Sequence, residues 1–273
     1  MTTPKSDKVS DLWATYVADR KAENVPTTDH TRCWKHLEPH FGYKIGSEIT
    51  KDDCRAYIKS RPAANSTIRQ ELALLRACLN LRYGRGNSHL VLPPASAPRD
   101  RFLTKEEAEQ LLAHVVTPHV RLFITLAITT GARMGAILDA EWDQVDFTTN
   151  TINYLAAGRH QTSKRRVMVP LNSRALAAIT EAKATAKSNR VIEYNGEGID
   201  NIKWGIRRAG RRAGVPCSPH VFRHTAGVWM AQADVPMQKI AQYLGHTSTA
   251  VTERVYARYS PTFMKDAADA LDW

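Results

Sequence analysis

The stretch SPHVFRHTAGVWMAQADVPMQKIAQYLGHTSTAVTERVYARYSP (Ser218–Pro261) carries the most informative pattern in this chain of 273 residues. Ser218 can cap a helix, Pro219 suits the first helical position, and an apolar-periodic run follows, so we predict a helix that begins here. After a break at 234–236, a second short helix is predicted from its apolar spacing, and Gly245 ends it.

Polar side chains of one chemical kind gather at the ends of these helices. His220 and Arg223 are three residues apart, so both project from one helix face near the N-terminal end, where the helix dipole favours a bound phosphate. His246 follows the second helix, and Tyr256 lies on a third helical run. No acidic residue belongs to this set, which therefore suits a reaction at a phosphate better than hydrolysis at a metal.

The order and spacing of these motifs resemble the C-terminal signature of the tyrosine recombinase (phage integrase) family. The run His220–His224 fits H-x-x-R-H, the run Leu244–His246 fits L-G-H, and Tyr256 follows ten residues after His246. Three ordered pieces agree, which makes the resemblance specific. It implies a site-specific DNA recombinase that cuts and rejoins strands through a 3′-phosphotyrosine intermediate, with no metal and no other cofactor.

The resemblance also gives the polar residues their roles. The family's arginines stabilise charge on the phosphate, as Arg223 would here, and His246 would add a hydrogen bond. Tyr256 would be the nucleophile and His220 the acceptor of its proton. We assign His224 to helix packing or to a hydrogen bond.

Arg133 is the second arginine that the resemblance marks as catalytic. It follows Gly131 in a pattern similar to the family's T-G-x-R box, which a leucine-rich helix follows. The family commonly has a glutamate three positions after this arginine, where this chain has Ala136. We therefore expect another group to orient Arg133, and Asp139 is the candidate.

A change of period predicts a β-hairpin in the second half of the chain. Apolar residues alternate in Thr151–Leu155 and Val167–Leu171, with a turn between them. The family has a catalytic lysine in this turn, which would protonate the 5′ leaving oxygen, and Lys164 is the candidate. A lysine at a sheet edge is more often only a solvated charge. Its neighbours Arg165 and Arg166 could contact phosphates instead.

Composition agrees with a DNA-binding protein without establishing one. Lys and Arg number 38 against 27 Asp and Glu, for a net charge of +11. A polyanionic partner is the simplest explanation, although many basic proteins bind no nucleic acid. The four cysteines are scattered and predict neither a disulfide framework nor a zinc site. No signal peptide or membrane span is predicted, so we expect the protein in the cytoplasm, associated with the nucleoid.

The predicted fold is mainly α with a small β-sheet, in two domains. Residues 1–84 contain four helical runs and resemble the family's core-binding domain, which clamps DNA. Residues 85–101 are rich in Gly, Pro, Ser and Arg and predict a basic linker. Residues 102–273 form the predicted α+β catalytic domain. They end in an amphipathic tail that docks on a neighbouring subunit in relatives, or more simply packs on its own domain.

Basic residues outside the catalytic set are candidate DNA contacts, although each could be only a solvated charge. They are Lys59, Arg61, Arg69, Arg99, Arg101, Arg165, Arg166, Arg207 and Arg211. The partner implied by the family is a double-stranded recombination site bound by a homo-tetramer. A monomer is the candidate state of the free protein.

Three alternatives stay open at this point. A zinc site could use His220 and His224, but Val221 stands where H-E-x-x-H has its acid. A type IB topoisomerase shares the chemistry, although the two-domain layout and the L-G-H motif favour a recombinase. A non-catalytic DNA-binding relative would have no use for Tyr256.

Overall fold

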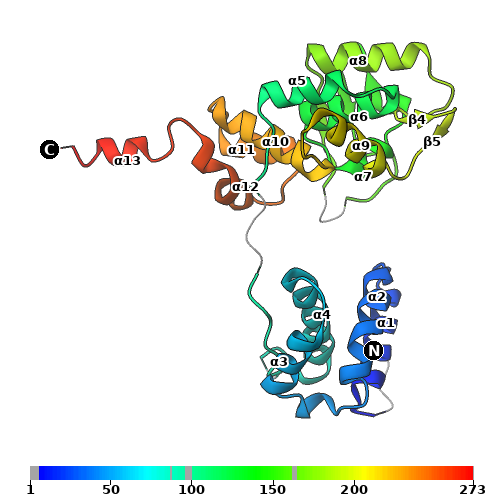
Figure 1. Cartoon of the computed structure of the whole chain (residues 1–273), viewed down its shortest axis with the longest axis vertical. Coiled ribbons are helices and arrows are strands. Elements are labelled where there is room, and N and C mark those ends of the chain that lie inside the picture. Colours follow the sequence, from blue (N-terminus) through cyan, green and yellow to red (C-terminus); the bar gives the residue numbers. More distant parts are fainter. Residues whose placement is uncertain (1–5, 87, 96–99, 162–164, 273) are drawn as a thin grey trace. The chain divides into compact units, whose positions relative to one another are not determined.

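The computed structural model describes residues 6–86, 88–95, 100–161 and 165–272, with only the backbone described at Asp266. The chain divides into two compact units, Met1–Arg99 and Asp100–Trp273, and each is described by itself (Figure 1). None of the described helices is both long and apolar enough to cross a membrane.

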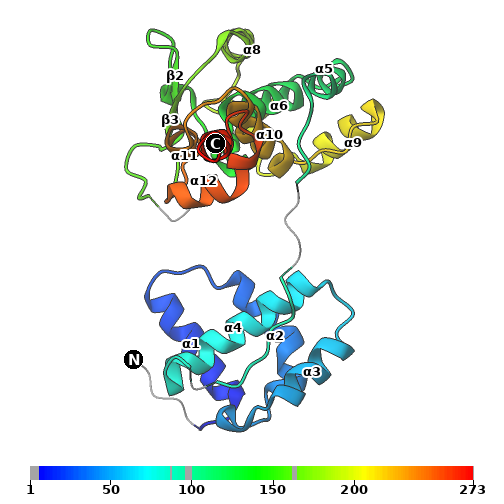
Figure 2. The ribbon, with the colours of Figure 1, turned by 90° about the vertical axis from the view of Figure 1, so that its left-hand side faces the viewer.

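Unit 1 is built from helices around a single core. Its elements are α1 (Val9–Ala22), α2 (Thr28–Phe41), the 3₁₀ turn η1 (Gly46–Glu48), α3 (Lys51–Ser60) and α4 (Asn65–Tyr83). The long helix α4 contacts α1, α2 and α3 and supplies the apolar stripe that they cover (Figure 2). At the start of α3, Thr50 accepts from the backbone N–H of Asp53 while the Asp53 carboxylate accepts from Thr50, which closes a capping box.

Part of the predicted linker belongs to unit 1. Leu90, Val91 and Leu92 pack against the core of this unit, and Pro93 is buried. The Pro93 carbonyl accepts a hydrogen bond of 2.6 Å from the Arg69 guanidinium. Apolar side chains within a Gly- and Pro-rich stretch thus fix residues 90–93 to the helices, so the predicted Arg69–phosphate contact competes with a contact inside the unit.

A buried acid explains the position of Arg61. Glu71 faces the core from α4 with 2% of its side chain exposed, and Arg61 binds it through two nitrogens at 2.9 and 3.3 Å. The Tyr57 hydroxyl donates to the same carboxylate at 2.7 Å. A buried charge is tolerated only with such partners, so the Arg61 guanidinium is occupied within the unit and we assign it a structural role.

Arg61→Ala is expected to destabilise unit 1 by roughly 3–5 kcal/mol, because it leaves the Glu71 carboxylate buried and without its cation. Amide hydrogen exchange in α4, read by mass spectrometry on the full chain, measures this loss for unit 1 alone. The matched control is the exposed Lys59→Ala, which should change stability by less than about 0.5 kcal/mol. Equal protection in the two variants would contradict the structural role.

Unit 2 holds the remaining elements around the apolar helix α6. Its α-helices are α5 (Lys105–Ala113), α6 (Pro118–Thr130), α7 (Met134–Leu138), α8 (Ser173–Ala184), α9 (Lys203–Ala213), α10 (Pro219–Gln232), α11 (Met237–Leu244), α12 (Thr249–Tyr256) and α13 (Lys265–Asp269). Two 3₁₀ turns are η2 (Trp142–Gln144) and η3 (Ala257–Tyr259). Helix α6 is buried along most of its length and contacts α5, α7, α8, α9 and α10.

The predicted hairpin is confirmed, with shorter strands. β2 (Thr151–Asn153) pairs antiparallel with β3 (Met168–Pro170), and β1 (Val145–Asp146) pairs with the other edge of β2. Ile152 lies opposite Val169, and both side chains are buried against the helices. A second pair, β4 (Glu193–Tyr194) and β5 (Glu197–Gly198), forms a separate hairpin.

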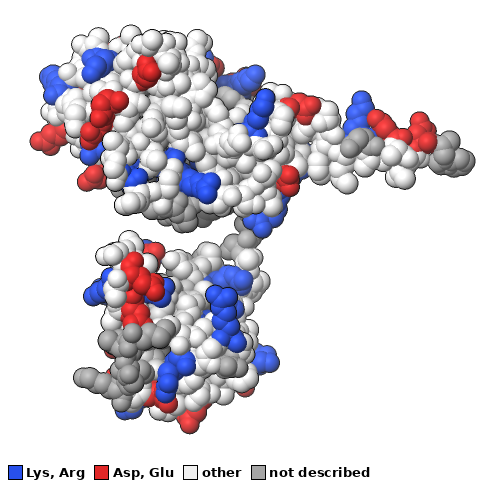
Figure 3. All heavy atoms as spheres, turned by 180° about the vertical axis from the view of Figure 1, so that it is seen from behind, with Lys and Arg blue, Asp and Glu red and all other residues white. Residues whose placement is uncertain are grey.

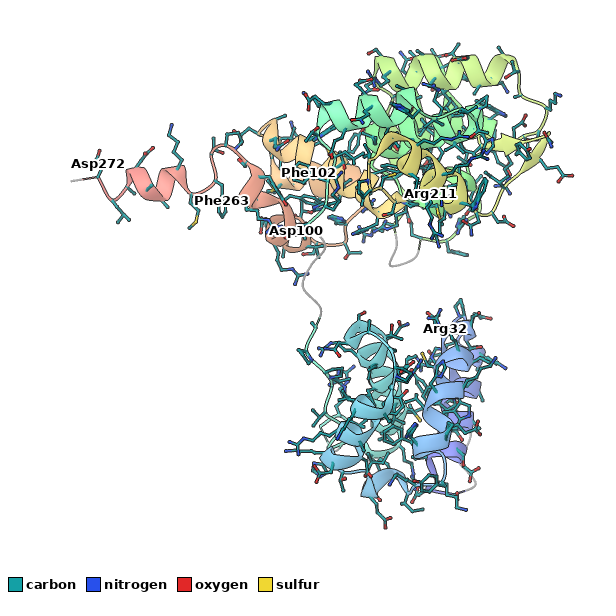
Figure 4. The ribbon with its side chains drawn as sticks, in the orientation of Figure 1. Arg32, Asp100, Phe102, Arg211, Phe263 and Asp272 are labelled. Atoms are coloured by element: carbon teal, nitrogen blue, oxygen red, sulfur yellow. The ribbon has the colours of Figure 1, made fainter. Side chains whose placement is uncertain are left out.

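The first residues of unit 2 are anchored on the helices that carry the site. Trp229 of α10 donates to the Leu103 carbonyl, and the Leu103 N–H donates to Thr225 of the same helix, both at 2.9 Å. Asp100 accepts a bond of 2.7 Å from Arg258 of η3. Figure 4 labels Asp100 and Phe102 at the end of unit 2 that holds α12. The chain therefore enters unit 2 along the segment that follows Tyr256.

The C-terminal tail extends away from the helices of its own unit (Figure 1). Three of its apolar side chains are exposed, Phe263 at 50%, Met264 at 61% and Leu271 at 78%. Packing on its own domain, the simpler expectation, is therefore wrong for these residues.

Candidate active site

Arg223 lies at the centre of the site, on the buried side of α10. Its Nη1 donates to the Gly131 carbonyl at 2.8 Å, where Gly131 ends α6 in a left-handed conformation that suits glycine. Its Nη2 is buried and has no hydrogen-bond partner among the described residues. One guanidinium nitrogen thus fixes the side chain, and the other is left for a ligand.

Arg133 approaches Arg223 from the start of α7. Its Nη1 donates to the Arg165 carbonyl at 2.8 Å, and burial lowers the pKa of Arg133. Burial, and then the charge of Arg133, lower the pKa of Arg223 to about 10. Two cations placed this close, with no carboxylate bonded to either in the described residues, form a site for an anion.

The expectation that Asp139 orients Arg133 is wrong. The Asp139 carboxylate pairs with Arg159, at 3.1 Å, and with Arg166. Because α7 is short and ends at Leu138, Asp139 faces the hairpin side chains rather than the helix start. The group that holds Arg133 is instead a backbone carbonyl of the predicted hairpin turn.

His246 completes the polar group beside the two arginines. Burial, and then the charges of Arg223 and Arg133, lower the pKa of His246 to about 4, so the ring is neutral near pH 7. Its Nδ1 forms a hydrogen bond of 2.7 Å with the hydroxyl of Thr252. A neutral imidazole can donate one hydrogen bond to an anion without adding charge.

The Tyr256 phenol is docked within its own unit, at the end of α12. Its side chain is 5% exposed and packs beside two imidazoles, His224 at 5.3 Å between ring centroids and His246 at 6.4 Å. Burial raises the pKa of Tyr256, and the charge of Arg223 opposes that rise. The charge of Arg223 therefore favours the ionised form of this phenol.

Gly227 of α10 makes room for the Tyr256 ring. A Cβ built on Gly227 would lie 2.4 Å from two ring carbons and 2.8 Å from the hydroxyl oxygen, closer than van der Waals contact permits. The ring can therefore lie against the helix that carries Arg223 because the helix has no side chain at this position.

Gly227→Val is expected to displace the phenol and slow its chemistry by about 10²-fold, the size of effect produced by a misplacement of about 1 Å. The measurement is the rate of covalent protein–DNA complex formation, compared with DNA affinity, which should change little. Gly135→Val is the matched control, since it also places valine in a helix but its Cβ meets no atom within 4 Å. A similar loss in both variants would show that helix propensity, not the ring contact, causes it.

The remaining catalytic candidates lie at the edge of this group. His220 is exposed at the start of α10, and its ring stacks on His224 at 6.5 Å rather than on Tyr256. Lys164 lies outside the described residues. The next residue, Arg165, is described, and its carbonyl accepts the hydrogen bond from Arg133.

The DNA-contact candidates fall into two groups. Exposed Lys59, Arg165, Arg207 and Arg211 are free to meet a backbone phosphate, and Arg211 is labelled on α9 in Figure 4. The guanidiniums of Arg61, Arg69, Arg101 and Arg166 are occupied by Glu71, the Pro93 carbonyl, Glu107 and Asp139 respectively. Arg99 lies outside the described residues. On the face shown in Figure 3, basic and acidic side chains are interspersed in both units.

The basic residues of α9 lie on two sides of the helix. Lys203 and Arg207 line a small cavity together with His220, whereas Arg208 and Arg212 line another with Trp204. Only the first side adjoins the site. Within the described residues, no three His, Cys, Asp or Glu side chains are arranged to hold a metal ion.

Residues 101–262 match the phage integrase family. The chain belongs to the phage integrase family. The predicted membership is thus confirmed, and with it the prediction of a tyrosine-type DNA recombinase. The chain is 24% identical to the tyrosine recombinase XerA of Thermococcus kodakarensis over 225 residues, 78% of each protein. It is 23% identical to an integrase of Streptomyces ambofaciens over 310 residues, 98% of this chain and 79% of that one.

Solved structures show the same fold in other integrases. The Tn1549 transposon integrase, in complex with a circular intermediate DNA, superposes with a TM-score of 0.83 at 16% identity, over 97% of this chain and all of that one. A lambda integrase dimer bound to a core site superposes with a TM-score of 0.72 at 14% identity, over 88% and 95% of the two chains. The predicted mainly helical fold with a small sheet is confirmed.

Sequence reasoning missed three parts of the site. Gly227 and Thr252 were not singled out, nor was the pair of backbone carbonyls that hold the two arginines. A glycine inside a predicted helix, three residues after His224, is a readable signal of a close packing contact. The carbonyls leave no signal, because every residue has one.

Proposed function

We propose that this phage integrase cuts and rejoins DNA strands at a specific duplex site through a covalent bond between Tyr256 and a 3′ phosphate. One observation carries the proposal. A buried phenol, a neutral histidine and two arginines converge in one unit, and within the described residues the arginines have no acidic partner and the buried Nη2 of Arg223 has no hydrogen-bond partner.

The proposed chemistry starts from charge on the phosphate. The non-bridging oxygens gain charge in the transition state, and Arg223 Nη2 and Arg133 would meet them with guanidinium donors. His246 would add a neutral donor. Because two fixed cations surround the phosphate, the phenolate becomes easier to form beside it.

The strand is then exchanged without net hydrolysis. The Tyr256 oxygen forms a bond to phosphorus as the bond from phosphorus to the 5′ oxygen breaks. We assign the phenol proton to His220 and the proton for the 5′ leaving oxygen to Lys164, as in the family pattern. The phosphotyrosine keeps the free energy of the phosphodiester, so another strand's 5′ hydroxyl can reseal it without ATP.

The proposed partner is double-stranded DNA bound by four copies of the chain. A lambda integrase tetramer on a Holliday junction has the same fold at 14% identity, with a TM-score of 0.72. We propose that unit 1 clamps the duplex, that Lys59, Arg165, Arg207 and Arg211 contact its backbone, and that the exposed tail docks on a neighbouring copy. Its place of action would be the nucleoid.

The test is covalent capture on defined DNA. Duplexes tiled across the DNA that flanks the gene, each with one nick, are incubated with the full chain in EDTA and without ATP. When cleavage occurs close to the nick, the short fragment that carries the 5′ hydroxyl dissociates, so the strand cannot be resealed and the adduct persists. Sequencing of the captured duplexes then identifies the site. Mass spectrometry is expected to find the phosphoryl group on Tyr256. Adduct formation that requires a metal, or that maps to another residue, would contradict the proposal.

A further inference from the structure

Thr252 of α12 is a fully buried polar residue of unit 2 that the proposed chemistry does not use. Its side chain is 0% exposed, and its hydroxyl lies 2.7 Å from Nδ1 of His246. No other hydrogen bond to this hydroxyl is found in the described part of the chain. Two other helical threonines of unit 2, Thr129 and Thr225, donate to the carbonyl four residues back, both at 2.8 Å. The Thr252 hydroxyl instead points to a catalytic candidate.

The proton count decides which atom donates. His246 is neutral, so only one of its two nitrogens carries a proton. If Nδ1 carried it and donated to Thr252, the buried hydroxyl proton would have no acceptor, which is unfavourable for a group removed from water. If the hydroxyl donates to Nδ1, the hydroxyl proton has its acceptor and Nδ1 has its donor. The proton of the ring then resides on Nε2.

The arginines alone would favour the opposite arrangement. The charges of Arg223 and Arg133 act on the His246 ring. Cations favour an unprotonated nitrogen with its lone pair turned toward them. An unprotonated nitrogen and a phosphate oxygen are both hydrogen-bond acceptors, so they would repel each other. A donor on the far side of the ring is needed to prevent this.

We propose that Thr252 is a positioning residue that fixes His246 as the Nε2–H tautomer, so that His246 can donate to the phosphate. The inference rests on the proposed function for the phosphate, while the tautomer itself is a property of the free protein. Thr252 touches no substrate in this scheme and acts only through His246.

The tautomer can be read directly without DNA. Long-range ¹H–¹⁵N correlation spectra of the ¹⁵N-histidine-labelled full chain distinguish protonated from unprotonated ring nitrogens, and loss of a signal in His246→Ala assigns it. We expect an unprotonated Nδ1 in the wild type near pH 7. A protonated Nδ1 would overturn the inference.

The kinetic test is a double-mutant cycle on a captured DNA site. Thr252→Val is nearly isosteric and should slow covalent complex formation by about 10- to 100-fold, a loss of the size seen when a metal-bound imidazole loses the partner that orients it. Thr252→Ser keeps the hydroxyl and should restore the rate to within about threefold of wild type. In a His246→Ala background, Thr252→Val should have less than about a twofold further effect.

The outcomes separate the possible failures. If Thr252→Val slows the reaction equally with and without His246, or if Thr252→Ser does not rescue, Thr252 supports packing only and the inference falls. Thermal unfolding of each variant shows whether a loss of rate follows a loss of fold. If the wild type captures no DNA at all, the proposed function fails, and the spectra still decide the tautomer.

Discussion

Tyr256→Phe is expected to abolish covalent protein–DNA complex formation, with a loss of at least about 10⁴-fold, while DNA affinity stays within about twofold. The substitution removes only the attacking oxygen. The ring should keep its place against Gly227 and the two imidazoles, because ring carbons make the shortest approach to Gly227 and the ring itself packs beside the imidazoles. Gel separation under denaturing conditions measures the adduct, and fluorescence anisotropy with the same duplex measures the affinity.

The matched control is Tyr259→Phe, three residues further along the chain. The Tyr259 ring packs on Phe102 at 5.5 Å, and its hydroxyl accepts from Arg258 at 3.2 Å. Its phenol is therefore turned toward the start of unit 2 rather than toward Arg223. We expect Tyr259→Phe to cut DNA at close to the wild-type rate. If instead the adduct persists in Tyr256→Phe and disappears in Tyr259→Phe, the nucleophile has been assigned to the wrong tyrosine.

The helix ends of the site were predictable because they depend on local chemistry. Ser218 caps α10 through the Val221 N–H, and Pro219 occupies its first turn, as the sequence indicates. Gly245 ends α11 in a left-handed conformation, which places His246 directly after the helix. Since these signals lie within a few residues of the side chains they position, the predicted catalytic residues of this stretch lie on the predicted elements.

The partners of the arginines could not be read from local patterns. Arg223 is held by the carbonyl of Gly131, and Arg133 by that of Arg165, contacts that join distant parts of the chain. The same limit applies to Arg61, which seemed a surface cation because nothing near it in sequence shows that Glu71 is buried. Tertiary packing decides whether a basic residue is free to contact DNA. A count of basic residues in the sequence therefore gives too many DNA contacts, because some of these side chains bind partners within their own unit.

Arg223→Lys should show how much of the chemistry depends on the geometry of a guanidinium rather than on its charge. Arg223 uses one nitrogen on the Gly131 carbonyl and keeps a second free in a buried position. A lysine ammonium is a single point, so it can reach the carbonyl or a phosphate but cannot hold both in fixed geometry. We expect covalent complex formation to slow by about 10²- to 10³-fold with DNA affinity nearly unchanged.

The control for Arg223→Lys is Arg207→Lys on exposed α9, beside His220. Lysine can replace arginine at a solvated phosphate contact, so this variant should form the adduct within about threefold of the wild-type rate. Both variants keep the net charge, which removes long-range steering as an explanation for any difference. If the two substitutions slow the reaction to the same extent, the buried nitrogen of Arg223 does not meet the reacting phosphate. Its burial would then serve only to join α10 to the end of α6.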